Sequence, residues 1–173
     1  MHIFVNILTL NKADFMKKVL NLIFVCALFV IAHNASAQFT NYTWKDYGVS
    51  FAVPSTHKVQ RSSGEVFESG DQLTWLEMYP YKDSEATAKG MISGIAGSEE
   101  GLTTMNEGAY KVGGYEGYWI TCNVSSHPEW QFWYIGFIDP ASDVNFYAKI
   151  WYKKNSPEAS KLAKEMSMKF KKM

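Results

Sequence analysis

Two side chains in the sequence have the types needed for a nucleophile and its base: Cys122, and His127 shortly after it, with Glu129 nearby. A thiol enzyme or hydrolase needs a reactive thiolate beside an imidazole. Cys122 shares the apolar face of a predicted strand with Ile120 and Val124, and a thiol in such a place is usually inert. We therefore expect no catalytic residue, and a thiol enzyme or hydrolase centred on Cys122 and His127 stays as an alternative.

Metal and phosphate chemistry has few candidate residues. His57 and His127 are the only histidines after residue 37, and neither lies in a His-Glu-x-x-His or Cys-x-x-Cys motif. The turn 139–143 holds two carboxylates suited to Ca²⁺, but Asp and Pro more often set the backbone of such a turn. Gly113-Gly114 lacks the lysine of a phosphate loop and precedes a predicted strand. We expect no metal and no cofactor.

Aromatic side chains form the strongest candidate for a binding site. Alternation in the predicted strands places six of them on one kind of sheet face, among polar residues such as Glu77 and Lys149: Trp75, Tyr79, Trp119, Trp133, Tyr147 and Trp151. Rings give contact area and polar atoms orient a ligand, which suits a sugar, a peptide or an apolar small molecule. The alternative is that a helix covers this face and leaves some rings at its rim, because sheets with aromatic residues on both faces usually need a second layer.

The elements that position these residues are mostly strands. Period-two alternation between turn residues predicts strands at 47–54, 57–62, 65–69, 73–81, 103–112, 115–124, 130–138 and 144–152. Short turns between successive strands predict antiparallel neighbours. The run 130–138 is apolar on both faces, as in a central strand that is covered on each side.

Two segments have helical spacing. The segment 83–96 begins with N-cap candidates and has apolar residues at Ala88, Met91, Ile92 and Ile95, and its Gly90 and Gly94 allow close approach to the sheet. Ser156-Pro157 predicts the start of a final helix whose apolar stripe runs from Ala159 to Phe170 and covers the strand 130–138. The predicted class is α/β (α+β): an antiparallel sheet of about six strands flanked by helices.

The N-terminal residues predict export. From Met16, two lysines precede an apolar run at 19–32, and small residues at Ala35 and Ala37 predict cleavage before Gln38. This run is shorter than the roughly 20 residues that cross a bilayer core. We expect upstream residues plus a signal peptide at 1–37, with the start at Met16, and a single domain at 38–173 in the periplasm or outside the cell. The short Lys-Lys leader suggests a bacterial exporter.

Charge and cysteine content limit the partners. The chain has 17 Lys+Arg and 17 Asp+Glu, which argues against bulk attraction to nucleic acid or to an anionic membrane surface. Cys26 follows Val25 and lies in the apolar run, so we expect no lipid anchor and no stable membrane anchor after cleavage. The tail 153–173 carries seven lysines and two acidic residues, whereas 38–152 carries seven basic and fourteen acidic residues. The basic tail keeps open a structural envelope component lying against an anionic surface.

Three segments carry a resemblance to a known family. Tyr47–Pro54, Val112–Gly117 and the stretch from Ala163 to Lys171 are similar to the opening strand, glycine hairpin and closing helix of the PsbP-like family. That α/β/α sandwich fold is shared by the extrinsic photosystem II subunit and the Ran-binding nuclear-import factor, and its members are mostly accessory or binding proteins. The resemblance implies a scaffold and no reaction. We expect an exported, non-enzymatic accessory or binding domain for a protein or small-molecule ligand, using the aromatic rim.

Overall fold

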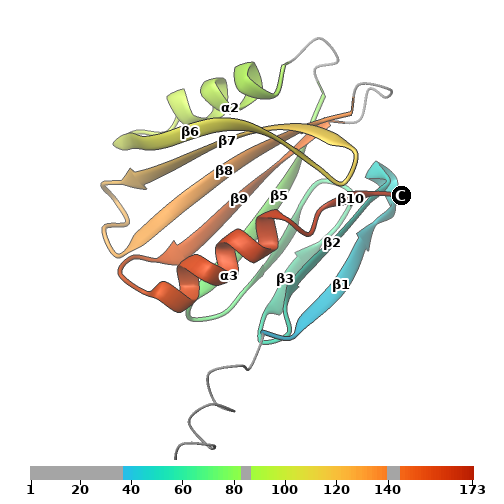
Figure 1. The fold of residues 1–173 in the computed structure, drawn as a ribbon, viewed down its shortest axis with the longest axis horizontal. Coiled ribbons are helices and arrows are strands. Elements are labelled where there is room, and N and C mark those ends of the chain that lie inside the picture. Colours follow the sequence, from blue (N-terminus) through green and yellow to red (C-terminus); the bar gives the residue numbers. More distant parts are fainter. Residues whose placement is uncertain (1–36, 83–86, 140–144) are drawn as a thin grey trace, which may run out of the picture. The chain divides into compact units, whose positions relative to one another are not determined.

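The centre of the fold is an antiparallel sheet of seven strands, shown in Figure 1. The structure, a computed structural model, describes residues 37–82, 87–139 and 145–173. Along the sheet the strands are β3 (Lys58–Ser62), β4 (Phe67–Gly70), β5 (Thr74–Tyr81), β9 (Asn145–Lys153), β8 (Trp130–Ile138), β7 (Tyr115–Val124) and β6 (Leu102–Val112). The expected antiparallel sheet is confirmed, and each of these strands lies within two residues of its predicted range.

The order of the strands differs from their order in the chain at one place. β9, the last long strand, lies between β5 and β8 and is antiparallel to both. Short turns predict only neighbours that follow one another in the chain, so the sequence did not predict this insertion. Its consequence is that β5 and β9, which are distant in the sequence, form adjacent parts of one sheet face.

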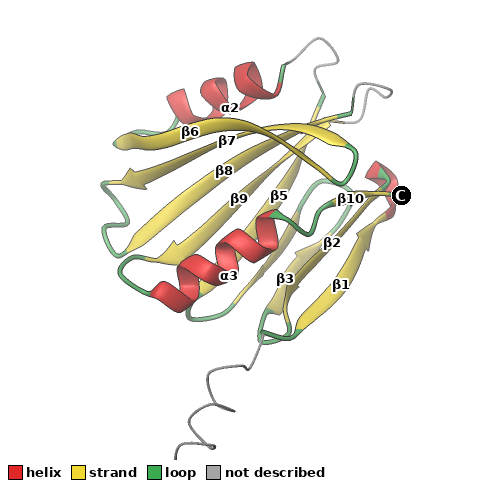
Figure 2. Cartoon of the chain, viewed as in Figure 1, coloured by secondary structure: helices red, strands yellow, loops and turns green. Residues whose placement is uncertain are grey.

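Two helices lie on opposite faces of this sheet (Figure 2). Helix α2 (Ala88–Gly97) packs on β7 and β8, and helix α3 (Pro157–Ser167) packs on β9, β5 and β2. The Ser156 side chain caps α3 by accepting a hydrogen bond from the Ala159 N–H at 3.2 Å, as predicted. The N-cap of α2 is Thr87, which accepts from the Gly90 N–H at 3.0 Å, and the N-cap candidates at 83–84 lie outside the described residues.

A second, three-stranded sheet was only partly predicted. Its order is β1 (Phe39–Trp44), β2 (Val49–Pro54) and β10 (Lys171–Lys172), and the short 3-10 helix η1 (Lys45–Tyr47) joins β1 to β2. The sequence predicted β2 but neither β1 nor β10. Phe170, expected on the stripe of the last helix, lies beyond its end and packs against Phe137 and Phe51, with ring centroids 4.5 and 6.0 Å apart. This buried ring fixes the chain end beside β2.

The close approach between helix and sheet comes from a strand glycine. A Cβ atom at Gly136 of β8 would lie 2.7 Å from Met91 Cε and 2.9 Å from Ile92 Cγ1, both on α2. By contrast, a Cβ atom at Gly94 would meet nothing within 4 Å. The expectation that the helix glycines allow the approach is therefore wrong, because they do not face the sheet.

Two sequence predictions fall largely outside the described residues. The predicted leader and upstream residues, 1–37, are outside them except for Ala37, and the turn 139–143 is outside except for Asp139. Asp139 is buried and forms an ion pair with Lys172 of β10, Nζ to Oδ2 2.6 Å. Within 37–82, 87–139 and 145–173, neither helix has the length and apolar character to cross a membrane.

Candidate functional site

Each helix covers only one half of its face of the seven-stranded sheet. Within the described residues, α2 lies over β7 and β8 on one face and leaves β5 and β9 without a helix. On the opposite face, α3 lies over β9 and β5, and no described helix lies over β6 and β7. The described residues form pockets on both faces, with volumes of about 480 and 300 Å³ on the α2 face and about 310 Å³ on the α3 face. Helix cover of the aromatic residues is therefore partial on both faces.

The six predicted aromatic side chains lie on both faces, so the expectation of a single face is wrong. The α2 face carries four of them and the α3 face carries two: Trp75, Tyr79, Tyr147 and Trp151 against Trp119 and Trp133. The reason is the register between β8 and β9, which opposes Trp133 to Ile150 and Trp151 to Phe132. Directly opposed residues share a face. Alternation within each strand does not give the register between them.

The larger pocket on the α2 face, called the indole pocket below, is lined by Asp71, Trp75, Glu77, His127, Trp130 and Trp151. Trp75 and Trp151 are directly opposed across β5 and β9, and both remain partly exposed. Gly70 opposes Trp75 on the other side, and a Cβ atom there would overlap the Trp75 ring. The absence of a side chain at Gly70 therefore lets the Trp75 indole lie against the sheet.

The opposite wall of the indole pocket is a cluster of rings around Trp151. Its ring centroid lies 4.7 Å from that of Phe132, 5.2 Å from His127 and 6.3 Å from Trp130. Trp130 was not among the predicted site residues. It begins β8, and it reaches the pocket only because β9 lies beside β8, a pairing that the sequence also left open.

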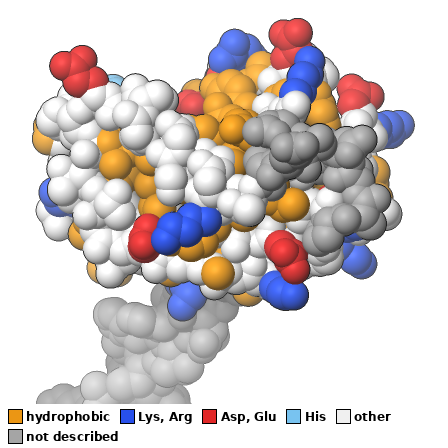
Figure 3. Space-filling model, turned by 90° about the horizontal axis from the view of Figure 1, so that it is seen from above, with side chains coloured by type: hydrophobic (Ala, Val, Ile, Leu, Met, Phe, Trp, Pro, Cys, Tyr) orange, Lys and Arg blue, Asp and Glu red, His pale blue; other side chains and the backbone are white. Residues whose placement is uncertain are grey.

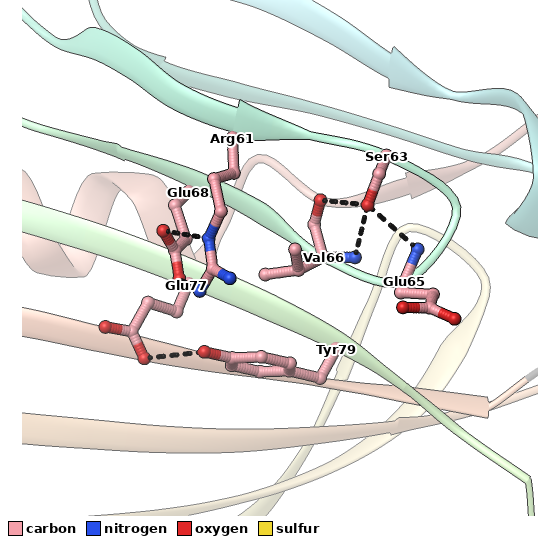
Figure 4. A network of polar contacts seen from close by, with 7 residues as sticks. All are labelled: Arg61, Ser63, Glu65, Val66, Glu68, Glu77 and Tyr79. Carbon is pink, nitrogen blue, oxygen red and sulfur yellow. Dashed lines mark hydrogen bonds and ion pairs between the residues drawn. The ribbon is translucent and has the colours of Figure 1, made fainter.

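A row of charged side chains, the charge row, crosses the strands of the same face next to the indole pocket. Arg61, Glu68, Glu77 and Lys149 are successively opposed from β3 through β4 and β5 to β9. Arg61 donates to Glu68 with two nitrogens, Nη2 to Oε1 and Nε to Oε2 at 2.6 Å, and Figure 4 shows the two side chains facing each other. In the same view the Tyr79 hydroxyl donates to Glu77 at 3.3 Å.

Lys149 is held by a carboxylate from the α2 side. Its Nζ lies 3.1 and 3.2 Å from the two carboxylate oxygens of Glu99, which also accepts a hydrogen bond from the Tyr134 hydroxyl. The same Nζ lies over the rings of Trp151, Phe132 and Tyr134, 4.7 to 5.2 Å from their centroids. Glu99 follows α2 directly, and the end of this helix places its carboxylate against β8 and β9.

The charge row holds two carboxylates, Glu68 and Glu77, and within the described residues Glu77 forms no ion pair. Burial raises the pKa of Glu77; the Lys149 charge opposes that rise, and Glu68 adds to it. Both cations of the row are paired with other carboxylates, Arg61 with Glu68 and Lys149 with Glu99. Glu77 also borders both pockets of the α2 face.

The second pocket on this face has phenol walls. Tyr79 and Tyr147 stack with centroids 5.2 Å apart and ring planes 22° apart. Ile95 and Ser98, from α2 and its C-cap, form the other side of this pocket of about 300 Å³. The charge row therefore lies between an indole pair and a phenol pair.

The α3 face carries the remaining two predicted residues. Trp119 and Trp133 meet nearly at right angles, with centroids 5.7 Å apart, in the pocket of about 310 Å³. Ser160 and Lys164 of α3 form its far side. Within the described part of the chain, the buried indole N–H of Trp133 has no hydrogen-bond partner. This pocket is separated from the indole pocket by the full thickness of the sheet.

The thiol alternative has no geometric support. Cys122 is 0% exposed among Ile120 and Val124, as predicted, and its Sγ contacts the Phe132 carbonyl oxygen at 3.9 Å. Burial raises the pKa of the Cys122 thiol to about 12, with the Glu99 charge adding and Lys149 opposing. A thiol with that pKa carries almost no thiolate at neutral pH. His127 packs on the rings of Phe132 and Trp151.

Solved structures share this arrangement of elements. Cyanobacterial PsbP (CyanoP) from Synechocystis sp. PCC 6803 matches with a TM-score of 0.57 and 12% identity, over 81% of this chain and 95% of that chain. The Ran-binding protein Mog1p from Saccharomyces cerevisiae matches with a TM-score of 0.52 and 9% identity, over 78% and 95%. A structure from Bacteroides thetaiotaomicron matches with a TM-score of 0.51 and 12% identity, over 79% of this chain and 49% of that one.

The chain has the PsbP-like fold. The fold implied by the resemblance is thereby confirmed. No protein-family model and no curated protein matches the sequence. At identities of 9–12% the PsbP-like fold alone is shared, so the function has to be argued from the pockets of this chain.

Proposed function

We propose that this chain is an exported, non-enzymatic binding domain whose ligand occupies the indole pocket. The observation that carries the proposal is that Trp75, Trp130 and Trp151 line a pocket of about 480 Å³ in the part of the α2 face that no described helix covers. Concave sites of this size, with mostly apolar walls and a few polar groups, are typical of small-molecule binding. A binding role is compatible with the fold, since Mog1p is a Ran-binding protein.

The polar groups of the pocket support binding more than catalysis. Asp71 accepts the backbone N–H groups of Leu73 and Thr74 at 2.8 and 2.9 Å and the Thr56 hydroxyl at 2.5 Å. These bonds fix the turn before β5 and thereby position Trp75. Glu77 is the remaining carboxylate, and its role is to orient a ligand against the indoles.

Three of the seven lysines of the basic tail contact other parts of the fold, which favours the pocket over a lysine-rich surface as the site of interaction. Lys153 lies 4.1 Å over the Trp130 ring, Lys169 lies 4.6 Å over the Phe39 ring, and Lys172 pairs with Asp139. In the view of Figure 3, acidic and basic side chains are interspersed around hydrophobic areas. A structural component lying on an anionic surface would need a continuous basic patch.

Export is part of the proposal and rests on the leader at Met16–Ala37. Expression in a bacterial host followed by N-terminal sequencing of the exported protein tests it. Gln38 as the first residue is the expected result. Protein that stays in the cytoplasm with the leader attached would contradict export without bearing on the pocket.

The binding site is tested by indole N–H resonances in a heteronuclear NMR titration with a panel of glycans, peptides, lipids and organic ions. We expect a panel member to shift the resonances of Trp75, Trp130 and Trp151. Trp44 serves as the internal reference, because it does not line the pocket. Its Nε1 donates a hydrogen bond of 2.7 Å to the Ser63 carbonyl oxygen. Trp75→Ala should abolish the shifts.

The matched control is Trp119→Ala, which removes an indole from the opposite face and should leave the titration unchanged. If no panel member moves the three pocket resonances, the proposed site is wrong. Shifts confined to Trp119 and Trp133 would also contradict it and would assign binding to the α3 face.

A further inference from the structure

We infer that the ligand of the indole pocket is a small organic cation, with a quaternary ammonium group held against the indoles and beside the Glu77 carboxylate. This inference rests on the proposed function and names the class of ligand for the same site. It follows from three features of the α2 face: the pairing within the charge row, the contacts of the rings, and the charges that line the pocket.

The first feature is an unequal number of charges. The charge row and the Glu99 side chain together hold three carboxylates but two cations, Arg61 and Lys149. Each cation is paired with an outer carboxylate, and the central one, Glu77, is left with a hydrogen bond from Tyr79. Lys149 lies opposite Glu77 and compensates it only in part, because its ion pair is with Glu99. A partly buried carboxylate that is compensated only in part is unfavourable, and a cation in the adjacent pocket would complete the compensation.

The second feature is that the rings around this pocket already contact cations. Lys149 Nζ lies 4.7 Å from the Trp151 centroid, and Lys153 Nζ lies 4.1 Å from the Trp130 centroid. The face of an indole carries negative electrostatic potential and attracts cations within about 6 Å of the ring centre. Trp75, opposed to Trp151 across the strands, has no such lysine among the described residues.

The third feature is the sign of the lining charges. Asp71 and Glu77 are the acidic residues that line the indole pocket. Among the described residues no lysine or arginine lines it, and Lys149 and Lys153 contact the Trp151 and Trp130 rings without forming part of the lining. This wall disfavours an anion and gives no advantage to a neutral sugar. A quaternary ammonium group has no N–H to lose from water, so its transfer between rings costs less than that of a primary amine.

The experiment compares choline with 3,3-dimethylbutanol, its uncharged carbon isostere, by isothermal titration and by the indole resonances of Trp75, Trp130 and Trp151. We expect choline to bind at least tenfold more tightly than the isostere. Glu77→Gln keeps the shape and the acceptor for Tyr79, and should weaken choline about tenfold while leaving the isostere unchanged, a difference of about 1.4 kcal/mol. The control Glu116→Gln removes the same charge from an exposed pair with Lys111 and should change neither.

Equal affinity for choline and its isostere in the unmodified protein would overturn the inference, and this result does not depend on any variant folding. A glycan or an anion that moves the three indole resonances when choline does not would also overturn it, and would leave the proposed binding function standing. If no compound moves the three indole resonances, the inference and the proposed binding function are both wrong. Binding of phosphatidylcholine vesicles in preference to free choline would assign the cation to a lipid headgroup and overturn a free compound as the ligand.

Discussion

The contact between α2 and β8 can be tested by adding one methyl group at Gly136. Helix α2 forms one wall of the phenol-lined pocket, and the end of α2 brings Glu99 to Lys149. The position of this helix therefore decides the geometry of the α2 face. In Gly136→Ala the new Cβ would lie 2.7 Å from Met91 Cε, 2.9 Å from Ile92 Cγ1 and 3.1 Å from the Ala88 carbonyl oxygen.

The size of the effect follows from these distances. The Met91 methyl group can move, but the Ala88 oxygen belongs to the backbone of the first turn of α2, so the helix itself must shift. Overpacking of this kind costs about 1–3 kcal/mol. Alanine also lowers the conformational entropy of the unfolded chain, which stabilises the folded protein by about 0.4–1 kcal/mol. We expect a net loss of about 1–2 kcal/mol, and a midpoint of thermal unfolding lower by about 3–6 °C for a domain of this size.

Thermal unfolding followed by circular dichroism measures the change, and Gly94→Ala is the matched control. Gly94 lies within α2, where a Cβ atom would meet nothing within 4 Å. This substitution should stabilise the protein by up to about 1 kcal/mol, because glycine is unfavourable inside a helix. The same substitution, glycine to alanine, should therefore lower the stability at position 136 and raise it at position 94. An unchanged or raised midpoint for Gly136→Ala would refute the close packing of α2 on β8.

Three further predictions concern buried groups. His57 hydrogen bonds to Ser69 and Thr74 at 3.1 and 2.7 Å, and burial lowers the pKa of its imidazole below 6.5. Because the unfolded chain then binds the proton more readily, the free energy of unfolding should fall as the pH drops from about 6.5 toward that lowered pKa. Urea unfolding at about pH 7 and pH 5 should show a smaller difference for His57→Asn, whereas an equal difference would refute this origin. Cys122 should resist iodoacetamide in the native protein and react in urea, as read by mass spectrometry, and rapid native labelling would contradict its burial. Phe170→Ala should cost about 3–5 kcal/mol in denaturant unfolding, because the ring is 2% exposed among Phe51, Phe137 and Phe146; a loss below about 1 kcal/mol would show that the chain end is not part of the core.

Local pattern predicted most strands of the large sheet and the start of α3, because alternation and the Ser156-Pro157 cap are properties of short segments. It did not predict β1 or β10, because both depend on tertiary contacts. β10 has two residues, and it pairs with β2 only where the buried Phe170 ring holds the chain. A two-residue strand has no periodicity for the sequence to show.

The candidate site was predicted in its residue types but not in its arrangement. All six predicted rings line pockets, yet they form two groups because the register of β8 against β9 opposes Trp133 to Ile150. Glu99 and Trp130 were missed for the same reason. Each joins the site through a neighbour that is distant in sequence, Lys149 for Glu99 and Trp151 for Trp130.

The pairing of β5 with β9 is the step on which the site depends most, and α3 explains why it is well defined. A shift of one residue would turn Trp151 and Lys149 toward the opposite face and bring Ile150 and Tyr152 to the pocket, since side chains alternate along a strand. On that opposite face, Ile150 and Ala148 are completely buried in the same core as Ala159 and Ala163 of α3, which follows β9 directly. The shift would expose these apolar residues and bury a lysine. The core beneath α3 thus fixes the register that sets Trp151 beside Trp75 and Lys149 beside Glu77, which makes the packing of one face the cause of the binding geometry on the other.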